Sequence, residues 1–176
     1  MSRIPTHTLA DAPEASRPVL QKIVQASPSG RPLNLHAQMA HSPAVLAAYA
    51  SLRGVIAEHG ALEAKVSWAL NVATAAAVGN AYMIGIATRF ARMNGWADEQ
   101  IAALLSGATT GDAKVDALAS VVREAATNSG KVSDATWNAA RQAGWGDTQV
   151  AEAFAHLGLT VFTGYFLNYA QTDADI

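Results

Sequence analysis

The feature that most constrains the fold is an uncharged run from Val66 to Thr88, interrupted by Gly79-Asn80. A membrane-spanning helix needs about 20 predominantly apolar residues in succession, whereas this run is rich in Ala and carries Ser67 and Asn71. Gly adopts positive φ readily, and Asn caps the following helix. The run therefore predicts two buried helices, Leu62–Val78 and Asn80–Asn94, that meet at a corner, and not a membrane span.

The rest of the chain also shows helical punctuation and no strand pattern. Apolar side chains recur at helical spacing between Ser-Pro, Gly and Asp signals that begin or end helices. The predicted architecture is an all-α bundle of about eight or nine helices in one domain, residues 1–176, with 1–13 as an extended N-terminal arm. The further helices are expected at Glu14–Gln25, Asn34–His41, Pro43–His59, Asp98–Ser106, from Asp112, from Ser133 to Gln142 and from Asp147 through Tyr165.

Two segments of the chain repeat one another. Asn94-Gly95-Trp96-Ala97-Asp98 resembles Ala143-Gly144-Trp145-Gly146-Asp147. Each predicts a joint between two helices in which Gly adopts a left-handed conformation, Trp packs over the joint and Asp caps the next helix.

Composition excludes several classes of function. The net charge is −2, and no basic cluster interleaves with aromatic residues, so nucleic acid is not an expected partner. The chain has no cysteine, which excludes disulfides, thiolate catalysis and cysteine-ligated metals. Cysteine-free composition fits a cytoplasmic protein, and no cofactor or metal is predicted.

The histidines are the side chains that ordinarily titrate near neutral pH. His36 and His59 lie at predicted helix ends and are expected to face solvent. His156 lies one turn after Glu152, so that both occupy one face of the last helix and form a candidate metal or acid/base pair. One such pair supplies too few ligands for a typical metal site.

In the order and spacing of several short motifs the chain resembles the alkylhydroperoxidase D-like, or carboxymuconolactone decarboxylase, family, in its peroxidase-related branch. The resemblance covers nearly the whole length. Its markers are Pro32-Leu33-Asn34-Leu35, Ala40-His41-Ser42-Pro43-Ala44, Leu62-Glu63-Ala64-Lys65, the Gly79 corner, Arg89 through Gly95, Val132-Ser133-Asp134-Ala135, Thr163 and Ala170-Gln171-Thr172.

The resemblance also indicates where a peroxidase site would lie. Active members have a Cys-x-x-Cys-x-x-x-His motif after the Gly corner and a Glu upstream of it. These positions fall on Asn80, Met83, Ala87 and Trp68 of this chain, none of which can act as thiolate, acid or base. The resemblance therefore implies a family member that has lost the thiol peroxidase site.

What remains at these positions is predicted to line a small apolar pocket with a few polar groups. An apolar or aromatic ligand is one reading, and close packing of the former site is the other. The lining predicted from the resemblance comprises Trp68, Asn71, Asn80, Tyr82, Met83, Ala87 and, from the last helix, Tyr165.

Three functions compete at this point. The first is a non-redox protein that binds a small apolar or aromatic molecule or acts as an oligomer. The second is a lyase or isomerase of the carboxymuconolactone decarboxylase type with His156, Glu152 or Tyr82 as relocated acid/base residues. The third, residual alkylhydroperoxidase activity, ranks last. The family assembles as dimers, trimers or hexamers, so a homo-oligomer is expected, with no nucleic-acid or membrane partner.

Overall fold

The computed structural model describes residues 2–27 and 29–175, which form nine α-helices, a 3₁₀ turn at Glu14–Ser16 and no strand. This confirms the all-α prediction. The α-helices are α1 Arg17–Ala26, α2 Asn34–Met39, α3 Pro43–His59, α4 Ala64–Val78, α5 Ala81–Met93, α6 Asp98–Ser106, α7 Ala113–Thr127, α8 Asp134–Gln142 and α9 Asp147–Ala170.

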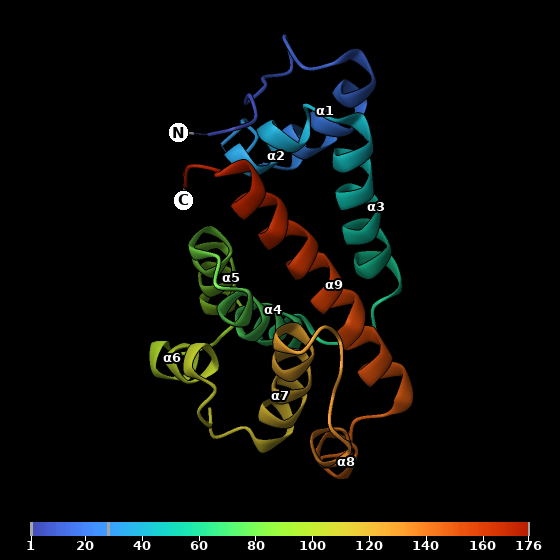
Figure 1. Cartoon of the computed structure of the whole chain (residues 1–176), viewed down its shortest axis with the longest axis vertical. Coiled ribbons are helices and arrows are strands. Elements are labelled where there is room, and N and C mark those ends of the chain that lie inside the picture. The colour runs from blue at the N-terminus through green and yellow to red at the C-terminus, as the bar shows by residue number, and fades with distance from the viewer. Residues whose placement is uncertain (1, 28, 176) are drawn as a thin grey trace.

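The helices form two groups joined by the long helix α9 (Figure 1). At one end, α1, α2 and α3 lie together with both ends of the chain, and α6, α7 and α8 lie at the other end. Helix α4 packs against α5, α7, α9 and α6, and its residues Val66 and Ala69 through Ala75 are buried. The uncharged run is therefore the centre of the bundle, as predicted.

Helix α9 is long and apolar enough to cross a membrane, judged by length and composition alone. The core helix of a folded bundle meets the same criterion, and α9 packs against α3, α4, α5 and α7. Its apolar character is therefore accounted for in part by packing, although one of its faces stays exposed.

Side-chain caps set the starts of several helices. Each capping side chain accepts a hydrogen bond from the backbone N–H three residues later. The pairs are Ser42 with Val45, Asp112 with Val115 and Ser133 with Thr136. Such caps satisfy backbone N–H groups that have no partner within the helix. This is why the predicted helix boundaries agree closely with the observed ones.

The two Gly-Trp joints have the same construction. The indole N–H of Trp96 donates to the Lys65 carbonyl at 2.8 Å, and that of Trp145 donates to the Lys114 carbonyl at 2.7 Å. In both cases the lysine precedes the tryptophan by 31 residues, and its ammonium group lies over the indole ring. The predicted packing of Trp over each joint is confirmed, and the repetition extends to α4 and α7.

The prediction that Asp98 and Asp147 cap the next helices is wrong by one residue. The N-caps are Ala97 and Gly146, whose backbone N–H groups donate to the side chains of Gln100 and Gln149. Each aspartate is therefore the first helical residue. The aspartates instead pair with arginines of the preceding helices: Asp98 with Arg92 at 2.5 Å and Asp147 with Arg141 at 2.9 Å.

Candidate functional site

The corner between α4 and α5 is built by Gly79 and Asn80. Gly79 has φ of +70°, which a residue with a Cβ rarely adopts, and it ends α4. Asn80 caps α5, its side-chain oxygen accepting from the Met83 N–H at 2.8 Å. The side chain at the first predicted cysteine position is thus engaged in helix capping.

Helix α9 covers this corner through a second asparagine. The Asn80 amide donates to the Asn168 side-chain oxygen at 2.6 Å and to the Gly164 carbonyl at 3.5 Å. Gly164 allows the close approach: a Cβ there would lie 2.9 Å from Val78 Cγ1 and 3.7 Å from Asn80 Cβ. Sequence reasoning missed Asn168, because nothing near it in the chain indicates a partner on α5.

The other positions of the predicted family site are packed. Ala87 and Met83 are buried, and Trp68 is half-buried with its ring stacked on Phe90 at 4.6 Å between centroids. Asn71 is buried and accepts from the Thr160 hydroxyl at 3.2 Å. These side chains offer no titratable group and no nucleophile.

Tyr165 lies elsewhere on the surface of α9. It is 59% exposed, whereas Gly164 and Leu167 are the buried residues of that turn. Two clefts described in the structure are likewise lined by other residues, one by the N-terminal segment with Asn34 and Asp173, the other by residues of α6, α7 and the loop between them. The family positions are therefore brought together chiefly as packed side chains.

Tyr82 has a polar environment of its own. Its hydroxyl donates to the Asp175 carboxylate and accepts from the Leu35 N–H at 3.5 Å. Burial, together with the nearby Asp175 charge, raises the pKa of Tyr82 well above its usual value. Tyr82 is therefore a hydrogen-bond donor and not a base.

The prediction that His36 faces solvent is wrong. His36 is only 6% exposed, and its Nε2 lies 3.3 Å from the hydroxyl of Tyr49, which is also buried. Burial, and next the positive charge of Arg53, lower the pKa of His36 to about 4. The position of His36 near a helix end did not indicate this burial, because the burial comes from packing against Tyr49 of α3.

Glu152 and His156 lie next to each other on α9, and the contacts of Glu152 are structural. The Glu152 carboxylate accepts from the N–H of Ala61 at 2.7 Å and from the N–H of Leu62 at 3.1 Å, which fastens the loop between α3 and α4. His156 Nε2 lies 3.6 Å from Glu152, and burial lowers the pKa of the buried His156. The Glu152 carboxylate already accepts hydrogen bonds from two backbone N–H groups, and the neighbouring imidazole is neutral. This arrangement does not specifically indicate acid/base catalysis.

The remaining titratable side chains do not gather into a metal centre. Among residues 2–27 and 29–175, no three His, Asp or Glu side chains lie close enough to hold a metal ion. The Glu152 and His156 pair therefore has no third ligand within that part of the chain.

Solved structures define the class of the fold. The chain superposes on a peroxidase-related alkylhydroperoxidase AhpD core protein from Ralstonia eutropha JMP134 with a TM-score of 0.83 and 19% identity, covering 99% of this chain and 92% of that one. A peroxidase-related protein from Silicibacter sp. TM1040 gives 0.78 and 14%, with 99% and 95% covered. The fold is that of the AhpD-like helical proteins.

A third relative by structure is the debrominase Bmp8. Its apo form superposes with a TM-score of 0.81 at 14% identity, covering 99% of this chain and 93% of that one. A cysteine-to-alanine variant of the same debrominase, in complex with 2,3,4-tribromopyrrole, matches equally well, with 92% of that chain covered. These likenesses concern the fold.

Part of the sequence also matches a protein-family model. The model of the carboxymuconolactone decarboxylase family matches residues 43–124, from α3 through most of α7. No curated protein matches the chain significantly. This match confirms the resemblance to the carboxymuconolactone decarboxylase family that was stated from the motifs.

Proposed function

We propose that this protein is a non-redox member of its family that has kept the helical bundle and lost the thiol peroxidase site. The observation that carries the proposal is the complete absence of cysteine. Peroxide reduction by thiols requires a thiolate to attack and a second thiol to resolve the product. Neither the capping amide of Asn80 nor the buried thioether of Met83 can perform those steps.

A peroxide-consumption assay tests this proposal. The protein is incubated with cumene hydroperoxide and dithiothreitol, and hydroperoxide loss is followed against a buffer blank. We expect no turnover above the blank. Turnover that scales with protein concentration would overturn the proposal.

The ligand that we propose for this protein is a small apolar or aromatic molecule held between α4, α5 and α9. The half-buried Trp68 and Phe90 rings give an aromatic surface at this place, with Asn71 and Asn80 as polar neighbours. The complex of the debrominase variant with a brominated pyrrole supports the idea that this fold accommodates such a ring. Because the positions are packed, binding requires the Trp68 side chain to move.

Thermal shift with 2,3,4-tribromopyrrole and unsubstituted pyrrole tests the ligand. We expect the brominated ring to raise the Tm of the unmodified chain, and to raise that of Trp68→Ala more, since this substitution leaves space between α4 and α5. If neither protein is stabilised by the brominated ring, the ligand proposal is wrong. The packed positions then serve the core alone, in a non-redox protein.

We also propose that the protein self-associates and is cytoplasmic. Helix α9 exposes an aromatic stripe made by Phe154, Phe162, Tyr165 and Tyr169. No Asp, Glu, Lys or Arg interrupts the chain between Glu152 and Asp173. Exposed apolar surface of this kind is typical of a contact between copies of a chain. The cytoplasmic location rests on the cysteine-free composition.

A further inference from the structure

The segment that follows α9 carries Asp175, whose carboxylate accepts hydrogen bonds from donors on α2 and α5. One Asp175 carboxylate oxygen accepts from the Tyr82 hydroxyl of α5, and the other accepts from the Asn34 N–H of α2 at 2.8 Å. Each oxygen of the carboxylate thus has its own donor. The donors are oriented by the packing of α2 and α5, and they would serve any carboxylate placed there.

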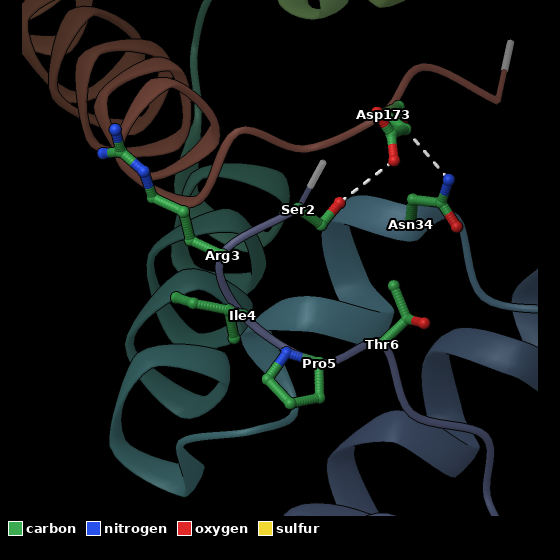
Figure 2. Close-up of a pocket in the computed structure, with 7 residues that line it drawn as sticks. All are labelled: Ser2, Arg3, Ile4, Pro5, Thr6, Asn34 and Asp173. Carbon is green, nitrogen blue, oxygen red and sulfur yellow. Dashed lines mark hydrogen bonds between the residues drawn. The ribbon is translucent and has the colours of Figure 1, made fainter.

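An open cleft adjoins these donors. It has a volume of about 530 Å³ and is lined by the segment Ser2 through Thr6, by Asn34 and by Asp173. Figure 2 shows Asp173 between Ser2 and Asn34, hydrogen-bonded to both. Ile4 and Pro5 contribute apolar surface to the cleft, and Arg3 contributes a positive charge. A cleft of this size suits a small organic molecule.

A buried polar side chain without a full set of partners lies beside the donors. His36 is two residues from Asn34 and is 94% buried by its exposed fraction of 6%, yet its Nδ1 has no hydrogen-bond partner. Buried polar atoms are nearly always hydrogen-bonded, so this exception calls for an explanation. This part of the molecule therefore holds a buried imidazole with a free nitrogen as well as the two donors.

We propose that Tyr82 and the Asn34 N–H form a binding site for a small carboxylic acid with an apolar or aromatic body, and that Asp175 occupies this site in the free protein. The ligand carboxylate would replace that of Asp175, and the ligand body would lie in the cleft beside Ile4 and Pro5. The segment after α9 is then a built-in competitor. This site shares Tyr82 with the lining predicted from the resemblance but does not use the packed Trp68, Met83 and Ala87, and it does not depend on the function proposed above.

Competition by a tethered group has a measurable size. Asp175 lies five residues beyond the end of α9, and a group on so short a connection acts at an effective concentration on the order of millimolar or more. A free acid must overcome this competitor. Removing the Asp175 carboxylate should therefore tighten binding of the acid about tenfold or more.

Titration calorimetry with benzoate as the probe tests the site. We expect Asp175→Ala to bind benzoate at least about tenfold more tightly than the unmodified chain, because the tethered competitor is gone. Adding Tyr82→Phe to Asp175→Ala should remove this gain. Benzamide, which has the same ring but no charge, should bind none of these proteins with comparable affinity.

Glu99→Ala is the matched control. It removes one negative charge at an exposed residue of α6, which does not line the cleft. We expect it to bind benzoate like the unmodified chain. Equal benzoate affinity for Asp175→Ala and Glu99→Ala would overturn the proposal, and so would benzamide binding equal to that of benzoate.

A measurement on the unmodified chain covers the case in which Asp175→Ala does not fold. Benzoate at tens of millimolar, but not benzamide, should shift the backbone amide resonances of Asn34 and Ala174 as the segment is displaced. If benzoate leaves both resonances unchanged, the proposal fails. Either result is independent of the peroxide and tribromopyrrole assays.

Discussion

His36 is a titratable side chain whose environment differs strongly between the unfolded and the folded protein. It is buried against Tyr49, and the lowering of its pKa to about 4 means that the folded protein resists protonation of the ring. In the unfolded chain the same ring takes up a proton near pH 6.5. Stability that is present above pH 6.5 is therefore lost as the pH falls toward 4.

We predict that His36→Gln weakens this pH dependence. Between pH 7 and pH 5, His36 should account for about 2 kcal/mol of the decrease in unfolding free energy, since each unit of pKa shift corresponds to about 1.4 kcal/mol. Urea unfolding at the two pH values measures it, with values at pH 8 as the reference. Burial also lowers the pKa of His156, so the contribution of His156 to the pH dependence should remain in the variant. An unchanged pH dependence in the variant would contradict the burial of His36.

We predict that replacing two glycines of α9 with alanine has opposite effects on the free energy of unfolding. Gly164→Ala places a Cβ 2.9 Å from Val78 Cγ1, whereas Gly158→Ala places one where no atom lies within 4 Å. The first substitution should cost about 1–3 kcal/mol through overpacking. The second should gain up to about 1 kcal/mol from helix propensity. Denaturant unfolding of both variants measures this, and the same sign for both would show that α9 does not approach α4 as described.

The α5–α6 and α8–α9 joints are built from the same set of contacts. Trp96 binds α4 through the Lys65 carbonyl, and Trp145 binds α7 through the Lys114 carbonyl. Each joint also carries an Arg-Asp pair and a glutamine that accepts from the N-cap amide. One local solution thus sets the direction of α6 relative to α5 and of α9 relative to α8.

We predict that Trp96→Phe and Trp145→Phe destabilise the protein equally. Each removes one hydrogen bond from a buried indole, which is worth about 1 kcal/mol. Thermal or urea unfolding of the two variants measures the costs. Trp137→Phe is the control, because its side chain is 43% exposed, and it should have little effect. If the losses in unfolding free energy differ several-fold, the two joints have the same geometry but contribute differently to stability.

The molecule as a whole leaves one long surface unpaired. Phe154, Tyr165 and Tyr169 are 68%, 59% and 70% exposed on α9, and Phe162 is 37% exposed. With about 200 Å² for each ring side chain, this is on the order of 450 Å² of exposed aromatic area. A standard interface buries about 800 Å² on each partner, so the stripe supplies more than half of what a second copy needs.

We predict that light scattering coupled to size-exclusion chromatography gives a mass above that of the 18.3 kDa monomer. Replacing Phe154 and Tyr169 with Glu should shift the mass toward the monomer, because both charges would be buried in the contact. Met93→Glu, at an exposed residue on α5, is the matched control and should leave the mass unchanged. A monomeric unmodified protein would contradict self-association.

Much of the fold was readable from local sequence. Gly79-Asn80 marked the α4–α5 corner, and Ser42-Pro43 marked the start of α3, because glycine conformation and side-chain caps act within a few residues. The burial of His36 was misread, and the caps at Asp98 and Asp147 were misplaced by one residue. Burial of one side chain depends on which distant segments cover it. The N-cap position depends on which residue has the extended backbone that leads into the helix, here Ala97 and Gly146.

Residue types and short spacings are enough to specify the helices, the central position of the uncharged run and the absence of thiol chemistry. The contacts of Asn168 with Asn80, of Glu152 with the α3–α4 loop and of Asp175 with Tyr82 arise from the folded arrangement. These contacts join residues 88, 91 and 93 positions apart. No local pattern encodes them, because each exists only once the packing of α9 against α4 has brought distant segments together.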